Sequence, residues 1–233
     1  MLRLRARVFL IAACALLASC ASMAEPAPRW SLVVHGGAGV IERASLTPEL
    51  EAQYRAAMQR ALTTGGAILD RGGSSLDAVE AIIHEMEDDP LFNAGRGAVF
   101  TAQGRNELDA SIMDGRTRAA GAVAGLTTIR HPISAARAVM ERSRHVMLIG
   151  EGAETFARSH NLETVDPSYF FTERRWQQLE QNLRANNLPV PPRPAGAPPA
   201  PRAELTYPDD HQFGTVGVVA LDTHGNIAAG TST

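Results

Sequence analysis

Apolar residues recur along the chain with two periods, one typical of helices and one typical of strands. Residues 50–70 and 76–86 place their apolar positions along one face of a helix. Ser74 stands just before the second of these helices, with Asp77 three residues later, which is typical of a capping box. Pro132 lies where a third helix would begin, a position that tolerates proline. The further predicted helices cover residues 133–142, 151–159 and 168–186.

Short apolar runs between these helices predict the strands of a sheet. Residues 30–35 have the pattern of a buried strand, and residues 121–128 are small enough to pack closely. Residues 216–221 and 226–229 flank an Asp-Thr-His-Gly turn, so they predict a hairpin. The other predicted strands are residues 107–113 and 146–149. Strands that alternate with helices indicate a fold of the α/β class.

One segment departs from both periods. Residues 188–207, LPVPPRPAGAPPAPRAELTY, are mostly proline, alanine and arginine. Such a composition cannot bury enough apolar surface to fold, so we expect an extended, mobile linker over residues 188–214. This linker separates a first part, residues 29–187, from a short second part, residues 215–233.

Composition narrows the class of protein. The 233 residues are 45% hydrophobic and 20% charged, with a formal net charge of −3. These values are ordinary for one globular domain with a sizeable core. Because the net charge is small and the basic residues are scattered, we expect no nucleic-acid partner.

The N-terminal segment has the pattern of an export signal. Basic residues precede about ten apolar ones, too few for a permanent span, which takes roughly 20. The sequence Leu-Ala-Ser-Cys ending at Cys20 resembles a bacterial lipobox, which predicts a signal over residues 1–19 and acylation of Cys20. Cleavage after Ala24 by an ordinary signal peptidase is the alternative. The other cysteine is Cys14, so neither route leaves a pair for an internal disulfide. We expect an exported, periplasmic protein that contacts a membrane only through its lipid anchor.

The passage from the linker into the last hairpin carries the candidate chemistry. If the bond between Gly214 and Thr215 breaks, Thr215 gains a free α-amine beside its own hydroxyl. Such an amine has a pKa of about 8, so it can accept the hydroxyl proton without a histidine. Gly214 lacks a Cβ and can adopt the strained dihedral angles that self-cleavage needs. A strand that merely begins with Gly-Thr is the alternative, and from the dipeptide alone it is the more common case.

The surrounding motifs favour the catalytic interpretation, because together they resemble the plant-type L-asparaginase and isoaspartyl peptidase family. These proteins are threonine-class Ntn hydrolases, and the resemblance extends from about Trp30 to Thr233. It rests on the stretches VVHGGAG (33–39), DPLFNAGRGAVF (89–100), ELDASIMDG (107–115), AGAVAGL (120–126), HVMLIGEGAE (145–154) and GTVGVVALDTHGNIAAGTST (214–233).

The resemblance implies an αββα sandwich and an enzyme that hydrolyses β-aspartyl dipeptides and L-asparagine. Thr215 matches the nucleophile released by autoproteolysis after Gly214, and Thr233 matches a second threonine that supports it. The two would lie side by side on one hairpin. Asn93 matches a pocket-side asparagine. No cofactor is implied for catalysis, and two αβ units would pair as (αβ)2.

The loop after the second helix resembles the family's sodium-binding loop, in which backbone carbonyl oxygens hold a structural ion. Carbonyl oxygen suits a hard cation. A glycine-rich turn without an ion is the alternative. The matching residues are Met86, Glu87, Asp89, Phe92, Ala94 and Arg96.

Other polar residues are of types found in catalytic sites, but their positions in the sequence favour structural roles. His35 follows the first strand, where we expect a histidine held by backbone groups near the core. Asp109 and Asp114 are expected to anchor turns and loops near the site. His211 and His224 fall in the linker and a turn and are expected to be solvated.

The family pattern continues beyond TST with residues that clamp the substrate, and this chain has none of them. We therefore expect a sandwich that is incomplete at the C-terminus and lacks part of the active site. Three alternatives follow: a non-catalytic remnant of the family, a glycosylasparaginase-like hydrolase, and a serine α/β-hydrolase. The last rests on Gly-Thr-Ser-Thr at residues 230–233, one glycine short of the G-x-S-x-G motif.

Overall fold

A six-stranded mixed sheet forms the centre of the computed structural model, which describes residues 30–37, 47–200 and 214–233. The strands lie in the order β1-β5-β6-β2-β3-β4. Neighbouring strands are antiparallel except for β3 and β4, which are parallel. The strands are β1 (Ser31–His35), β2 (Leu108–Asp114), β3 (Ala120–Leu126), β4 (Met147–Ile149), β5 (Val216–Leu221) and β6 (Ile227–Ser232).

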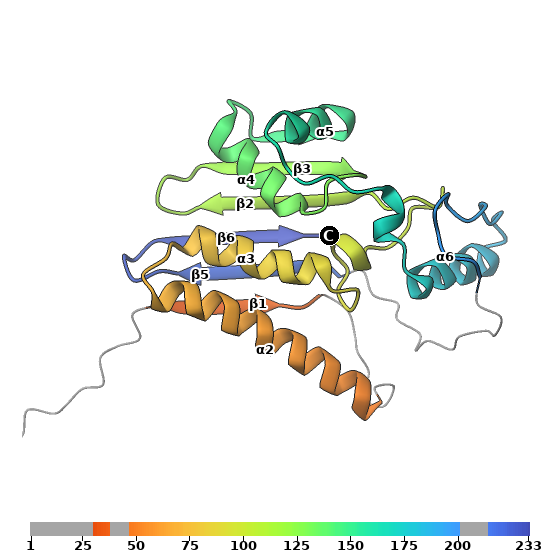
Figure 1. The fold of residues 1–233 in the computed structure, drawn as a ribbon, viewed down its shortest axis with the longest axis horizontal. Coiled ribbons are helices and arrows are strands. Elements are labelled where there is room, and N and C mark those ends of the chain that lie inside the picture. The colour runs from red at the N-terminus through yellow and green to blue at the C-terminus, as the bar shows by residue number, and fades with distance from the viewer. Residues whose placement is uncertain (1–29, 38–46, 201–213) are drawn as a thin grey trace, which may run out of the picture.

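Helices α2, α3 and α4 lie together over one face of this sheet (Figure 1). Helix α5 packs beside β3 and β4, and α6 lies beyond the end of the sheet. The helices are α2 (Pro48–Asp70), α3 (Ser75–Asp88), α4 (Pro132–Arg142), α5 (Gly150–Ser159) and α6 (Glu173–Ala185), with 3-10 turns η2 (Gly95–Gly97) and η3 (Pro167–Phe170). None of these described helices is both long and apolar enough to cross a bilayer.

The sheet buries one face and leaves the other open. In β2 the residues alternate strictly between buried and exposed, as a strand with one covered face requires. The covered face packs on α3 and α4 through small and branched side chains. The open face carries apolar residues that the described residues do not cover, among them Val33, Met113, Val219 and Ile227. The mixed α/β class is therefore confirmed, whereas the four-layer sandwich and its incompleteness stay predictions.

Local sequence signals account for most element boundaries. Ser74 is the N-cap of α3, and its side chain accepts a hydrogen bond from the N–H of Asp77 at 3.1 Å. Thr47 caps α2 in the same way through the N–H of Leu50. Pro132 is the first residue of α4, as predicted.

Two predicted elements differ from the structure. Residues 168–186 do not form one helix: η3 ends at Phe170, and Thr172 then caps α6 by accepting a hydrogen bond from the N–H of Arg175. Strand β1 is not buried, because it lies at the edge of the sheet and Val33 is 66% exposed. An apolar run alone does not distinguish an edge strand from a central one.

The first half of the predicted linker is packed against the domain. Residues 188–200 form neither helix nor strand, as expected, but Val190 and Ala197 lie on the cluster around Trp176. Arg193 stacks on the Phe171 ring at 4.8 Å and pairs with Glu173 at 2.6 Å. This packing differs from the mobile chain that composition predicts. Residues 201–213, with His211, and the export signal with Cys20 lie outside the described residues, so the domain boundaries stay predictions.

Candidate active site

The β5–β6 hairpin brings the two candidate threonines together. Val216 pairs with Ser232, so extending this antiparallel register by one residue places Thr215 opposite Thr233. Val216 and Ser232 are buried against the helices, and side chains alternate along a strand. The side chains of Thr215 and Thr233 therefore lie on the open face of the sheet. The structure thus places the two threonines side by side, as expected, while their catalytic roles stay predictions.

Thr233 is fixed by strand β2 on its other side. Its N–H donates to the carbonyl of Asp109 at 2.9 Å, and its own carbonyl accepts from the N–H of Asp109 at 3.0 Å. The Asp109 side chain accepts from the N–H of Gly125 at 2.8 Å, which ties the β2–β3 pair together beside the site. Asp114 anchors the following turn through Arg116 and Thr117. Both aspartates therefore shape loops and strands, as expected, rather than form an acid pair.

The end of β1 reaches the predicted cleavage point. His35 pairs with Gly217, and the chain then passes Gly214, so that a Cβ on Gly37 would lie in van der Waals contact with the Gly214 Cα, at 3.7 Å. Gly37 has a φ of +134°, which L-residues rarely adopt. Gly37 thus lets the segment after β1 turn beside Gly214, next to the predicted cleavage point. His35 itself is exposed, so the expectation of a histidine near the core is wrong.

Asn93 shapes the loop that follows α3. It is 8% exposed, and its Oδ1 accepts a hydrogen bond from the N–H of Val99 at 2.9 Å. The neighbouring Phe92 ring packs on Gly36, 3.3 Å from the position of a Cβ there. The loop thereby touches the glycine stretch that passes Gly214. A role for Asn93 in a substrate pocket stays a prediction.

Backbone carbonyl groups gather in the same loop. Met86 and Glu87 are among the last four residues of α3, whose carbonyls have no partner within the helix. A Cβ on Gly95 would collide with the Glu87 carbonyl oxygen, and one on Gly97 with that of Phe92. Glycine at both positions thus lets the loop fold back on these carbonyl groups, and an ion held by them stays a prediction. The remaining expected ligands, Asp89, Ala94 and Arg96, belong to the same turn. Among the described residues, no cluster of acidic, histidine or cysteine side chains could hold a metal ion instead.

The sequence motifs did not predict a role for the side chain of Glu87. This residue is 0% exposed, and its Oε1 accepts hydrogen bonds from Ser232 Oγ at 2.6 Å and from the N–H of Ile133 at 3.0 Å. Burial raises the pKa of Glu87 to about 8. A signal existed: Glu87 continues the apolar i, i+4 row of Val79 and Ile83, so its position on the buried face could have been predicted.

Ser232 is not a nucleophile. It is 1% exposed, faces the helices and donates its hydroxyl to Glu87. It lies in a hairpin strand, not in a strand-to-helix elbow. The serine α/β-hydrolase alternative is therefore wrong.

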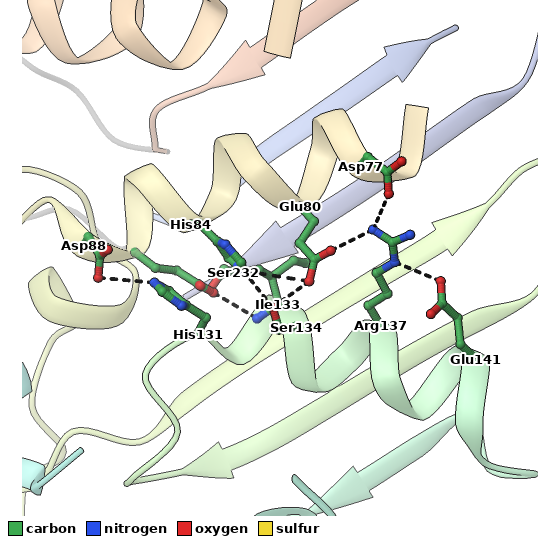
Figure 2. A network of polar contacts seen from close by, with 11 residues as sticks. Asp77, Glu80, His84, Asp88, His131, Ile133, Ser134, Arg137, Glu141 and Ser232 are labelled. Carbon is green, nitrogen blue, oxygen red and sulfur yellow. Dashed lines mark hydrogen bonds and ion pairs between the residues drawn. The ribbon is translucent and has the colours of Figure 1, made fainter. Parts of the chain in front are cut away.

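A second polar network lies between α3 and α4 (Figure 2). Ser134 Oγ donates to Glu80 at 2.5 Å and lies 2.6 Å from His84 Nε2. Because the hydroxyl proton points to Glu80, His84 acts as a donor here and not as a base. Burial and the stacked ring of His131, with a centroid distance of 4.1 Å, lower the pKa of His84 to about 4. This network joins two helices and provides no activated serine.

The sequence of this chain is similar to those of known proteins. Residues 28–233 match the family described as Asparaginase. The chain is 45% identical over 202 residues to an isoaspartyl peptidase of Salmonella typhimurium, covering 87% of this chain and 61% of that protein. It is 41% identical over 202 residues to an isoaspartyl peptidase/L-asparaginase of Xenopus laevis, covering 87% of this chain and 58% of the relative. A plant-type L-asparaginase of Pyrococcus furiosus is 45% identical over 153 residues, 66% of this chain and 48% of its own length. The chain thus spans about 60% of the length of the first two relatives.

Proposed function

Since this chain belongs to the asparaginase family, we propose that it is a hydrolase of β-aspartyl dipeptides and L-asparagine, activated by cleavage between Gly214 and Thr215. The observation that carries the proposal is the register of the β5–β6 hairpin, which sets Thr215 opposite Thr233. The printed names of the relatives, isoaspartyl peptidase and L-asparaginase, support the substrate class.

The residues around Gly214 support a route for activation. The hydroxyl of Thr215 attacks the carbonyl carbon of Gly214, and the Gly214–Thr215 amide becomes an ester after transfer of the acyl group. The Gly214–Thr215 C–N bond breaks in this transfer, and the hydroxyl proton passes to the nitrogen, so the α-amine of Thr215 is free in the ester. Water then hydrolyses the ester, which gives the Gly214 carboxylate and restores the Thr215 hydroxyl. The passage of Gly37 beside Gly214 supports this step, because the segment after β1 lies next to the proposed cleavage point without a side chain at Gly37.

Catalysis then repeats the same chemistry on the substrate. The free amine, with a pKa of about 8, accepts the proton of the Thr215 hydroxyl as the oxygen attacks the side-chain carbonyl of the aspartyl or asparaginyl group. The C–N bond breaks, and the protonated amine or ammonia leaves. Water hydrolyses the resulting β-aspartyl ester. Thr233, half-buried on the neighbouring strand, supports the attacking oxygen by hydrogen bonding.

The loop after α3 is proposed to hold a structural sodium ion. Backbone carbonyl oxygens of Met86, Glu87, Asp89, Phe92, Ala94 and Arg96 would bind it, and the ion would stabilise the loop without entering the chemistry. A thermal unfolding series in sodium chloride and in choline chloride at equal ionic strength tests this. A higher melting temperature in sodium supports the site, and equal temperatures contradict it.

Export and anchoring through Cys20 are a further proposal, supported by the N-terminal pattern alone. The wild-type protein should incorporate radiolabelled palmitate in bacterial cells, and Cys20→Ser should not. Processing of both proteins after Ala24 without labelling would support the ordinary signal peptide instead.

Pairing of two αβ units into (αβ)2 is proposed from the family resemblance. Sedimentation of the processed protein should give the mass of four chains, two of each kind. A mass of one αβ unit would contradict the proposal.

The central test uses Thr215→Ala. The variant should run as one uncut band on a denaturing gel, whereas the wild type gives two fragments and hydrolyses β-Asp-Leu. Cleavage of the variant at the wild-type rate would contradict the proposed nucleophile.

A further inference from the structure

The end of β6 rests on a buried acidic side chain. Glu87 lies on the covered face of the sheet, directly behind the strand whose last residues are Ser232 and Thr233. It is surrounded by the apolar core around Ile83 and Ile133. A carboxyl group in such surroundings loses its hydration and needs hydrogen bonds in return.

Glu87 connects three elements through one oxygen atom. Its Oε1 accepts from Ser232 on β6 and from the N–H of Ile133 in the first turn of α4, while its backbone belongs to α3. Figure 2 shows Ile133 and Ser232 within the network between α3 and α4. The Ile133 N–H is one of the orphan donors of the α4 N-terminus, and no side chain of the N-cap residue His131 satisfies it.

Burial of the Glu87 carboxyl group costs folding free energy. The other carboxyl oxygen, Oε2, is buried and has no hydrogen-bond partner among the described residues. An unpaired buried polar atom destabilises the folded state, and an apolar side chain of similar volume would avoid that cost. Stability alone therefore does not explain a glutamate here.

The location of Glu87 behind the end of β6 gives a reason for a glutamate at this position. Ser232 and Thr233 are consecutive, so their side chains leave the strand on opposite faces. Fixing Ser232 from behind limits how far Thr233 can move in front. Without the Glu87 side chain, the end of β6 would be held by backbone hydrogen bonds. These are the bonds between Thr233 and Asp109 on β2, and the pairing of β6 with β5.

We propose that Glu87 is a positioning residue, which holds Ser232 and thereby sets the Thr233 hydroxyl against Thr215. The proposal rests on the proposed function, since it concerns the alignment of that site. Its basis is the chain of contacts from Oε1 of Glu87 to Ser232 and along the backbone to Thr233. It gives the side chain of Glu87 a role separate from that of its backbone carbonyl in the loop.

Substitution of Glu87 in the protein tests this role. Glu87→Met fills the volume but removes the acceptor, so we expect self-cleavage and kcat per processed molecule to fall on the order of 10²-fold, with KM unchanged. Glu87→Gln keeps an oxygen for both donors and should restore both rates close to the wild-type values.

Two further variants separate positioning from folding. Asp222→Asn weakens the opposite end of the same hairpin and should lower the melting temperature while leaving kcat per processed molecule unchanged. Ser232→Ala removes only the hydroxyl that contacts Glu87, so it serves if Glu87→Met does not fold. It should lower kcat, and adding Glu87→Gln to it should change kcat little further.

The outcomes distinguish this proposal from the proposed function. Wild-type kcat in Glu87→Met or Ser232→Ala, with only a lower melting temperature, overturns the positioning role and leaves the enzyme intact. Equal losses in Glu87→Gln and Glu87→Met also overturn it, because the acceptor would not be what matters. A wild-type protein that neither cleaves itself nor hydrolyses β-Asp-Leu refutes the proposed function itself, and the positioning role with it.

Discussion

Two buried carboxyl groups hold the two ends of the β5–β6 hairpin. Glu87 lies behind its open end, where Thr215 and Thr233 meet, and Asp222 lies in its turn. The sequence motifs did not predict a role for either side chain. The motifs predicted that the two threonines face each other on one hairpin, because a hairpin is local. A contact between residues 145 positions apart, such as Glu87 with Ser232, depends instead on the packing of α3 under β6.

The turn should depend on the charge of Asp222. Its carboxylate accepts from the N–H groups of His224, Asn226 and Ser75, which links the turn to the start of α3. Asp222→Asn should lower the free energy of unfolding by about 1–3 kcal/mol at pH 7, measured by urea denaturation.

This difference should also depend on pH. Although burial would raise it, the N–H donors, beginning with that of Asn226, hold the pKa of Asp222 below its usual value. A lowered folded-state pKa stabilises the protein above the unfolded-state pKa, near 3.8, and the contribution is lost as pH falls through the folded-state pKa. The gap between wild type and Asp222→Asn should thus be full at pH 7 and shrink below about pH 4. A gap that stays constant from pH 7 to pH 2.5 would contradict this.

The Thr233 hydroxyl should matter for rate rather than for folding. Thr233→Val keeps the branched shape and both backbone hydrogen bonds to Asp109 but removes the hydroxyl. We expect kcat to fall by about 10²-fold, typical of losing one stabilising hydrogen bond at a reacting oxygen, with the melting temperature nearly unchanged. Steady-state kinetics with β-Asp-Leu would show this, and an unchanged kcat would exclude a supporting role.

At the scale of elements, periodicity predicted most helices and strands but not their environment. The helix over residues 48–70 follows from its apolar stripe and its caps, which are local. The exposure of β1 does not, because position at the sheet edge is set by pairing with β5, almost 200 residues away. The packing of residues 188–200 on Trp176 was missed for a similar reason: proline-rich composition describes the segment but not the surface that it meets.

Close contact between β3 and α4 gives a prediction at this scale. A Cβ on Gly121 would collide with the backbone of Ala136 and Met140. Gly121→Ala should force the helix away from the sheet and lower the free energy of unfolding by about 1–3 kcal/mol. The control is Gly152→Ala within α5, where a Cβ meets nothing within 4 Å; it should stabilise by about 0.5–1 kcal/mol. Urea denaturation of both variants would decide, and equal effects would contradict the close packing.

At the scale of the whole molecule, the main feature is a sheet with one covered face. The opposite face carries the two threonines and exposed apolar side chains, including Val219, which is 47% exposed. The sequence indicated an α/β class correctly, but the layer expected on the open face depends on family resemblance and not on the pattern of residues 30–233.

The open face offers a test of the four-layer arrangement. If a second sheet covers it in the protein, Val219→Glu buries a charge and should cost several kcal/mol in the free energy of unfolding. Thr223→Glu, at an exposed turn position, is the control and should change it by less than about 0.5 kcal/mol. Equal effects for the two variants would mean that the face is open to water.

The central claim concerns the bond between Gly214 and Thr215. N-terminal sequencing of the purified wild-type protein, after incubation long enough for processing, tests it directly. The account predicts a new chain that begins Thr-Val-Gly-Val in the wild type and is absent from Thr215→Ala. A wild-type protein that hydrolyses β-Asp-Leu while its chain remains intact at residue 215 would contradict it.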